Sequence, residues 1–186
     1  MITYTTANGR RDLEGILALQ KSNLARNLTP EDIRNQGFVT VDHTYDQLEN
    51  LNNHERHVIA KDDDRVIGYV LAMTSQSKFD IPVIVPMFRV FDSITYGGRK
   101  VTAYNYIVVG QVCVDREYRG RGIFDECYSA YKTFYSGKYD FAITEIAKTN
   151  HRSLNAHKRI GFKEIHSYFS PDNSEWSIVL WDWISA

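Results

Sequence analysis

Hydrophobic residues recur along this 186-residue chain with two spacings, one typical of helices and the other of strands. Leucine and isoleucine residues three or four positions apart predict an amphipathic helix over 12–28. Runs rich in valine, isoleucine and tyrosine, bounded by polar turn residues, predict strands. In all, we expect helices over 12–28, 46–53, 123–135 and 153–159, a further helix starting at Thr29-Pro30, and strands over 2–6, 57–60, 66–74, 104–114, 141–147, 162–169 and 174–184. Strands on both sides of helices, with at least one parallel strand–helix–strand step, predict a mixed α/β fold.

Glycine and proline mark where several of these elements end. We expect Gly137 to end the helix 123–135 as a left-handed cap, and Gly161 to end the helix 153–159. Between residues 75 and 100 the pattern changes, because Pro82 and Pro86 interrupt an apolar run and argue against a central strand. We interpret this stretch as an insertion that contains one short helix over 87–94.

Composition and charge exclude several classes of protein. Hydrophobic residues make up 43% and charged residues 24% of the chain, as in ordinary globular proteins, and its length predicts a single domain over 1–186. The formal net charge of -1 gives no electrostatic drive toward nucleic acid or an anionic membrane, so we expect neither partner. Cys113 and Cys127 suggest no disulfide framework, and neither a signal peptide nor a bilayer-spanning run is recognisable. We therefore expect a cytoplasmic protein.

The most informative stretch lies between residues 111 and 128. An apolar run stops at Asp115, two glycines follow between arginines, and helical spacing then resumes. A strand that leads through a glycine-rich turn into a helix presents free backbone N–H groups and the positive end of the helix dipole, which attract phosphate. Gly120 and Gly122 allow a close backbone approach, and the arginines beside them add charged donors. The sequence predicts a cofactor that carries a diphosphate, although it matches neither nucleotide pattern, G-x-x-x-x-G-K-[ST] or G-x-G-x-x-G.

Two motifs in this half of the chain resemble those of a known family. Arg119-Gly120-Arg121-Gly122-Ile123 is similar to the acyl-CoA loop of the GNAT superfamily of N-acyltransferases, whose pattern is Gln/Arg-x-x-Gly-x-Gly/Ala. Placing the two glycines of this chain on those of the pattern puts Glu117 where Gln or Arg is usual. Asn150-x-x-Ser153-x-x-Ala156-His157-x-Arg159-x-Gly161-Phe162 resembles the family's downstream segment, Asn-x-x-Ala-x-x-Leu-Tyr-x-Lys-x-Gly-Phe.

The resemblance implies a fold, a function and a set of binding residues. The fold is a GNAT-like mixed central sheet of about six to seven strands flanked by helices, with a V-shaped splay for acyl-CoA. The function is the direct transfer of an acetyl group from acetyl-CoA to a primary amine of a small molecule or peptide. The insertion at 75–100 would border the acceptor amine or act only as a surface-packing loop. The residues expected to bind the cofactor are Val112, Cys113, Val114, Arg119, Gly120, Arg121, Gly122, Ile123, Phe124 and Asn150. Asn150 could also cap the helix that follows it, and the two roles are compatible.

Two residues are candidates for catalysis. His157 stands where the family commonly has a tyrosine, and an imidazolium there could protonate the departing thiolate; otherwise it is a structural histidine on a helix surface. Glu145, on the strand 141–147, is a candidate general base. Its alternative role is an ion pair with Lys148 or Arg152. Cys113 has no histidine patterned beside it, so we reject it as a nucleophile.

Other functions stay open at this point. The main rival is a non-catalytic module that binds or senses acyl-CoA, and a second is a transferase that uses a longer acyl-CoA or aminoacyl-tRNA. No histidine is spaced with acids or cysteines as metal ligands are, so no metal is expected. Trp176, Trp181 and Trp183 on the closing strands are candidates for a contact in a homodimer.

Overall fold

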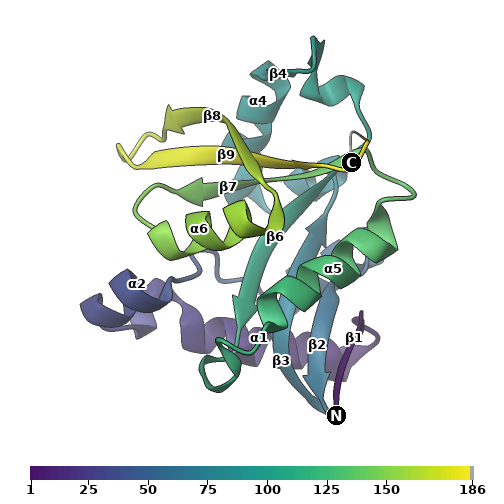
Figure 1. Ribbon diagram of the computed structural model, residues 1–186, viewed down its shortest axis with the longest axis vertical. Helices are drawn as coiled ribbons and strands as arrows, with labels where there is room; N and C mark the ends of the chain where they lie inside the picture. The colour runs from purple at the N-terminus through teal and green to yellow at the C-terminus, as the bar shows by residue number, and fades with distance from the viewer. Residues whose placement is uncertain (185–186) are drawn as a thin grey trace.

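The computed structural model describes residues 1–184 and is organised around one seven-stranded sheet. Its strand order is β1-β2-β3-β6-β7-β9-β8, and β6 and β7 form the parallel pair in an otherwise antiparallel sheet (Figure 1). The strands are β1 (Ile2–Thr6), β2 (Val58–Asp62), β3 (Arg65–Met73), β6 (Tyr106–Val114), β7 (Phe141–Ala147), β8 (Lys163–Phe169) and β9 (Glu175–Asp182), while β4 (Thr95–Tyr96) and β5 (Arg99–Lys100) form a separate hairpin. The mixed α/β sheet predicted from the sequence is confirmed.

Helices cover both faces of this sheet. They are α1 (Arg10–Asn23), α2 (Pro30–Gln36), α3 (Tyr45–His54), α4 (Val85–Ser93), α5 (Ile123–Tyr135) and α6 (His151–Ile160). One face carries α1, α3 and α4, and the opposite face carries α5 and α6 (Figure 1). None of the helices within residues 1–184 has the length and apolar character that a bilayer-spanning segment needs.

Local signals explain most helix boundaries, and two predicted boundaries are wrong. Thr29 caps α2 by accepting a hydrogen bond from the Asp32 N–H, with proline next to it, as expected. By contrast, α1 ends at Asn23 because Leu24 turns to an extended conformation and forms a β-bridge with Val39. The helix α5 ends without the left-handed glycine cap predicted at 137, since its C-cap residue, Ser136, keeps right-handed helical angles.

The insertion at 75–100 folds around α4, which spans Val85–Ser93 rather than 87–94, with Pro86 in its first turn. The α4 side chains Phe88 and Phe91 are buried in a hydrophobic cluster with Ile143 of β7 and Ile178 of β9. The insertion is therefore packed on the same sheet face as α1 and α3. It forms part of the core rather than a loosely attached surface loop.

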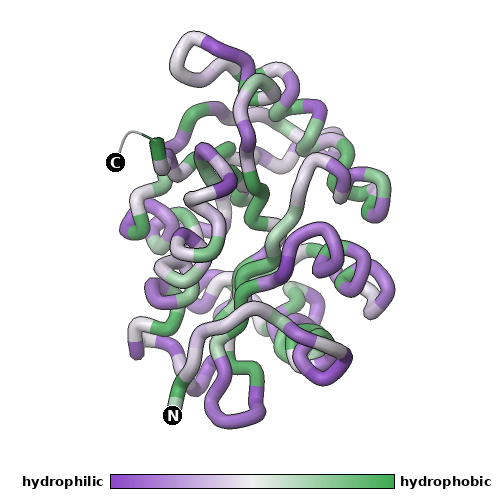
Figure 2. Tube along the Cα trace, turned by 90° about the vertical axis from the view of Figure 1, so that its right-hand side faces the viewer, coloured by the Kyte–Doolittle hydropathy of each residue, from purple (hydrophilic) through white to green (hydrophobic). Residues whose placement is uncertain are grey.

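The rest of the core lies between the strands and the other helices, and Figure 2 shows hydrophobic residues concentrated in the central strands. Tyr128 and Tyr131 of α5 are fully buried against the sheet. Trp181 and Trp183, two of the tryptophans considered for a dimer contact, lie in edge-to-face or tilted contact with these tyrosines. Both rings therefore pack within the chain.

The two parallel strands separate soon after they meet. Three residue pairs link β6 to β7, and the last joins Val108 to Ile143. Just beyond, β6 carries a bulge, because its residues 109–112 face only residues 70–72 of β3. A Cβ atom on Gly110 would lie 2.0 Å from the Met73 sulfur, so another residue at this position would force the buried Met73 side chain to move. Thr144 Oγ1 donates to the Val109 carbonyl at 2.7 Å, which satisfies a backbone group that β7 no longer pairs.

Three buried histidines are held in the neutral form. His57 donates from Nε2 to the Leu48 carbonyl and accepts the Ala72 N–H, and burial lowers its pKa to about 3. His43 donates to Gln20, and burial lowers its pKa to about 4. His157 is buried on α6, where burial likewise lowers its pKa to about 4. All three groups therefore favour protonation of the unfolded chain over protonation of the folded protein.

We expect stability to fall as the pH drops from 6.5 to 5. Each histidine takes up a proton in the unfolded chain near pH 6.5 but stays neutral in the fold until its lowered pKa is reached. The free energy of unfolding should therefore lose about 1.4 kcal/mol per pH unit for each histidine once the pH is below 6.5. Urea unfolding between pH 7 and 5 measures the slope, and His43→Gln should reduce it by about one third. A free energy of unfolding that does not change across this range would contradict the prediction.

Candidate active site

Two cavities meet where β6 and β7 separate. The larger has a volume of about 560 Å³ and lies between the loop after β6, α6 and the segment that follows α2. The smaller, of about 80 Å³, lies at the splay and is lined by Thr144, Glu145 and His157 among others. Both are lined by Phe38, Val39, Val112, Asn150 and Ser153. The two cavities are therefore adjacent and share one wall; together they are called the groove, which extends from the glycine loop to the splay.

The structure brings nearly all of the expected binding residues together around the larger cavity. Its lining includes Val112, Cys113, Val114, Arg119, Gly120, Gly122, Ile123, Phe124 and Asn150. Arg121 does not line it; this exposed side chain lies over the Tyr118 ring, with its guanidinium carbon 5.2 Å from the ring centroid.

The glycine loop presents open backbone to the larger cavity. Gly120 and Gly122 have φ angles of 77° and 78°, and a Cβ atom on either would meet nothing within 4 Å. Gly122 is the N-cap of α5, and no side chain in the described part of the chain caps this helix end. The first N–H groups of α5 are thus available to a ligand, and the helix dipole adds positive potential. This geometry suits a phosphate group.

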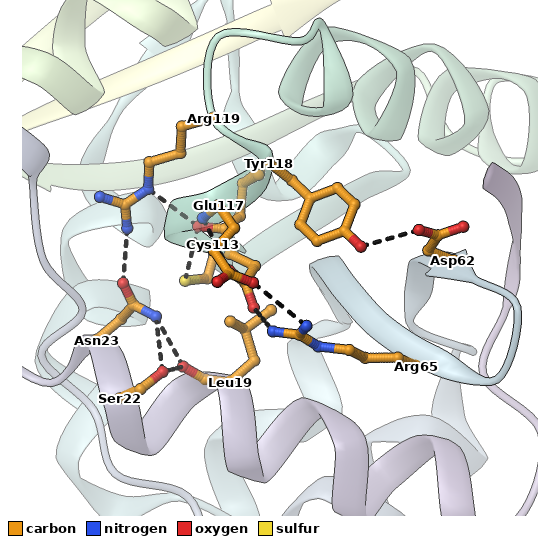
Figure 3. Close-up of polar contacts among 11 residues, drawn as sticks. Leu19, Ser22, Asn23, Asp62, Arg65, Cys113, Glu117, Tyr118 and Arg119 are labelled. Atoms are coloured by element: carbon orange, nitrogen blue, oxygen red, sulfur yellow. Dashed lines mark hydrogen bonds and ion pairs between the residues drawn. The ribbon is translucent and has the colours of Figure 1, made fainter. Parts of the chain in front are cut away.

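Arg119 holds the loop from inside, as Figure 3 shows. Its guanidinium donates to the Val114 carbonyl at 3.0 Å, to Gln36 Oε1 at 3.1 Å and to Asn23 Oδ1 at 2.6 Å. Burial lowers the pKa of the Arg119 side chain, but the pKa of a guanidinium is so high that Arg119 stays charged at neutral pH. Three of its five N–H groups thus join the ends of α1, α2 and β6. The other two leave the expected contact of Arg119 with a diphosphate as a prediction.

Glu117, the departure from the family pattern, turns away from the loop. Its carboxylate pairs with Arg65, which also binds Asp115, at the start of β3 (Figure 3). The pattern Gln/Arg-x-x-Gly-x-Gly/Ala also fits with Arg119 at its first position and Gly122 at its fourth. In that alignment Phe124 stands at the sixth position, where the pattern has Gly or Ala. The Phe124 ring lines the larger cavity and contacts the rings of Tyr128 and His157 at centroid distances of 5.0 and 5.4 Å.

Asn150 connects α6 to the opposite wall of the groove. Its Oδ1 accepts the Ser153 N–H at 3.2 Å, so the predicted capping role is confirmed. Its Nδ2 donates to the Phe38 carbonyl at 3.3 Å. The amide side chain therefore fixes the distance between α6 and the segment after α2 where the two cavities join.

His157 is engaged on both ring nitrogens. Nδ1 lies 2.8 Å from the Ser153 carbonyl, which can only accept, so Nδ1 carries the proton. Nε2 then accepts from the hydroxyl of Tyr128 at 2.6 Å. Because burial also lowers its pKa to about 4, the ring is neutral at neutral pH. This geometry argues against an imidazolium acid, and it places His157 inside the protein rather than on the helix surface.

Glu145 lies at the smaller cavity, on the face of the sheet opposite α6. It shares a face of β7 with Phe141 and Ile143, which pack with α4. Its carboxylate accepts a hydrogen bond from Tyr168 at 2.5 Å and pairs with neither Lys148 nor Arg152. Burial raises the pKa of Glu145, and the hydrogen bond from Tyr168 partly offsets this. A carboxylate of this kind can accept a proton at neutral pH.

The Cys113 thiol is not arranged as a nucleophile in the described structure. The Cys113 thiol is buried, burial raises its pKa to about 12, and no histidine contacts it. Within residues 1–184, no group of three His, Cys, Asp or Glu side chains is placed to hold a metal ion. The insertion at 75–100 shares the sheet face of Glu145, yet none of its residues lines either cavity of the groove.

Solved structures of low sequence identity share this fold. The ribosomal-protein-S18-alanine N-acetyltransferase of Escherichia coli aligns with a TM-score of 0.63 and 10% identity, over 98% of this chain and 94% of that one. NAA60 of Arabidopsis thaliana, in complex with a bisubstrate analogue, aligns with a TM-score of 0.64 and 17% identity over 98% of both chains. A NatC complex bound to Gag peptide and CoA gives 0.65 and 14%, over 97% of this chain and 98% of the other.

The family can be identified from the sequence of the chain itself. Comparison with curated protein sequences finds no match. Residues 24–162 match the model of the family described as Acetyltransferase (GNAT) family, and this range contains the splay, the glycine loop and α6. The chain therefore belongs to the GNAT family of acetyltransferases, and it is a transferase.

Proposed function

We propose that this protein transfers an acetyl group from acetyl-CoA directly to a primary amine of a small molecule or peptide. The observation that carries the proposal is this groove of two adjacent cavities at the splay. Its larger cavity has phosphate-binding geometry at the α5 end, and Glu145 lines its smaller cavity. Donor and acceptor would then meet between β6 and β7 without a covalent enzyme intermediate.

The donor side of the groove fits CoA. Acetyl-CoA supplies the activated acetyl group as a thioester. The N–H groups between Gly120 and Phe124 would hold its diphosphate, and the backbone of residues 112–114 would pair with the amides of its pantetheine arm. Asn150 lies beside that path, and a backbone N–H of β6 would polarise the thioester carbonyl. The CoA in the NatC neighbour supports this choice of donor.

The acceptor side fits an amine. Glu145 would accept the proton that the amine loses as it attacks, because this acidic residue lines the smaller cavity. Trp176, which also lines this cavity, adds an aromatic surface on which a cationic amine can rest. The neighbours include an enzyme for ribosomal-protein alanine and one bound to a peptide, which supports peptide as well as small-molecule acceptors.

The first experiment is calorimetric titration with acetyl-CoA, CoA and ATP, followed by an assay of CoA thiol release. Acetyl-CoA should bind with a micromolar dissociation constant and ATP much more weakly. Peptides with free N-termini, lysine peptides, polyamines and arylalkylamines then serve as acceptors, and acyl-CoAs of increasing length test the donor. Acetyl-CoA binding with no amine-dependent thiol release would favour the acyl-CoA-sensing alternative. Absence of CoA binding would contradict the proposal.

A methyl group on Gly120 should block CoA binding. Its Cβ would occupy the open space beside the loop, so Gly120→Ala should weaken acetyl-CoA binding by about 10- to 100-fold, as expected for lost hydrogen bonds to a charged group. Gly98 is a matched control, since its φ of 80° and its open surroundings impose the same backbone strain far from the groove. Calorimetry of Gly120→Ala and Gly98→Ala separates the effect of backbone strain from obstruction of the ligand. If the two variants bind acetyl-CoA with equal affinity, the glycine loop is not part of the binding site.

Replacement of Glu145 should affect the chemical step. Glu145→Gln should lower kcat by about 10²- to 10⁴-fold, as loss of a general base does. In the wild type, kcat/KM should fall as the pH drops through the pKa of Glu145, which burial raises above its ordinary value. Tyr168→Phe removes the hydrogen bond that lowers this pKa, so the decline should begin at higher pH.

The pH profiles of these variants and of Glu164→Gln provide the comparison. Glu164 lies on β8 outside both cavities and pairs with Lys148, so its replacement should leave kcat unchanged. Wild-type turnover in Glu145→Gln would show that another group accepts the proton.

A further inference from the structure

We propose that Ser153 stabilises the departing CoA thiolate through its hydroxyl hydrogen, and that His157 and Tyr128 act as positioning residues for Ser153. The proposal rests on the acyl transfer proposed above. It assigns the leaving-group role to a residue that stands where the family pattern has alanine. It also gives a function to the histidine found where the family commonly has tyrosine.

The position of Ser153 is the first observation. It lies in the first turn of α6, where its N–H is held by Asn150 Oδ1 at 3.2 Å. It lines both cavities, together with Val112 of β6 and Asn150. A ligand that passes from the glycine loop into the splay must cross this junction, which is where the bond to the leaving sulfur would break.

The direction of the hydroxyl is the second observation. The Ser153 Oγ lies 3.3 Å from Nδ1 of His157. Since that nitrogen already carries a proton, which it shares with the Ser153 carbonyl, the hydroxyl oxygen can only accept from it. The hydroxyl hydrogen of Ser153 is therefore left to donate elsewhere.

Three other helical hydroxyls use their hydrogen internally, whereas Ser129 of α5, which is exposed to solvent, has no such acceptor within residues 1–184. Ser22, Ser93 and Thr133 each donate to a carbonyl three or four residues earlier. Ser153 donates to no carbonyl or carboxylate within residues 1–184, and its only side-chain partner there is His157. Its donor thus faces the groove without a protein acceptor.

Tyr128 fixes this arrangement from behind. Its hydroxyl donates to Nε2 of His157 at 2.6 Å, which keeps the second nitrogen unprotonated and the first protonated. Both side chains are almost completely buried, and Phe124 and Phe162 pack edge-on against the imidazole. The ring therefore cannot rotate freely, and the order Tyr128, His157, Ser153 sets which way each hydrogen points.

The proton balance needs no further reagent. As the amine nitrogen bonds to the carbonyl carbon, its proton passes to Glu145, and the carbon–sulfur bond breaks with its electron pair on sulfur. Ser153 donates a hydrogen bond to that sulfur and keeps its own proton, so no alkoxide forms and His157 stays neutral. The thiolate and the protonated Glu145 then return to their resting states by exchange with solvent.

The test compares Ser153→Ala with Ser153→Thr, which keeps the hydroxyl. In the saturated CoA complex, Ser153→Ala should raise the pKa of the bound thiol by about 1 to 2, followed by thiolate absorbance during pH titration. The same variant should lower kcat by about 10- to 100-fold while the dissociation constant for acetyl-CoA stays unchanged. Ser153→Thr should retain most of both properties. Ser129→Ala, an exposed serine of α5 outside the groove, should match the wild type.

The outcomes separate this inference from the proposed function. An unchanged thiol pKa in a Ser153→Ala protein that binds CoA and turns over would overturn the role of Ser153 and leave the acetyltransferase intact. The wild type could bind CoA without amine-dependent thiol release, while Ser153→Ala still raises the pKa of the bound thiol. That result would support the hydrogen bond from Ser153 and reject the proposed reaction. Failure of the wild type to bind CoA would overturn both.

Discussion

The separation of β6 and β7 is the constraint on which the rest of the site depends. Paired parallel strands satisfy their own backbone groups and leave no entrance between them. Here the bulge at Gly110 bends β6 while Thr144 takes over the Val109 carbonyl, so the gap opens without leaving that buried group unpaired. The backbone beyond the bulge is then free to bind an extended ligand arm. A side chain at position 110 would force the Met73 side chain out of its present place beside the bulge.

Arg119 fixes the position of the glycine-loop end of the groove. The helix α2 buries no residue of its own and is held by polar contacts, among them Gln36 with Arg119 and Asp32 with Arg116. The loop that would hold the diphosphate is therefore also the anchor for the opposite wall. Backbone N–H groups and the α5 dipole would supply most of its attraction for an anion, because three of the five guanidinium N–H groups of Arg119 already bond within the protein.

The sequence predicted features whose causes lie within a few residues of one another. The Thr29 cap, the glycine loop and the Asn150 cap are of this kind, and the structure contains all three. The end of α1 was missed because it depends on a bridge from Leu24 to Val39.

Side-chain partners distant in sequence were missed for the same reason. Arg119 contacts Asn23, and Glu145 contacts Tyr168 rather than the nearby Lys148 or Arg152. A charge pattern gives the type of partner a residue needs, whereas the topology decides which of several candidates is within reach.

The substitution at position 157 is best understood together with Tyr128. A lone histidine in place of tyrosine would be shorter and would lose a hydroxyl that could face the groove. Here Tyr128 supplies a hydroxyl from α5 to the far side of the imidazole, and the near side meets Ser153. Because all the polar atoms of this buried pair have partners, it costs little to bury, and it determines the tautomer of the ring. In the proposed arrangement the donor role that one tyrosine could fill would be shared among three residues, of which Ser153 carries the hydroxyl hydrogen offered to the ligand.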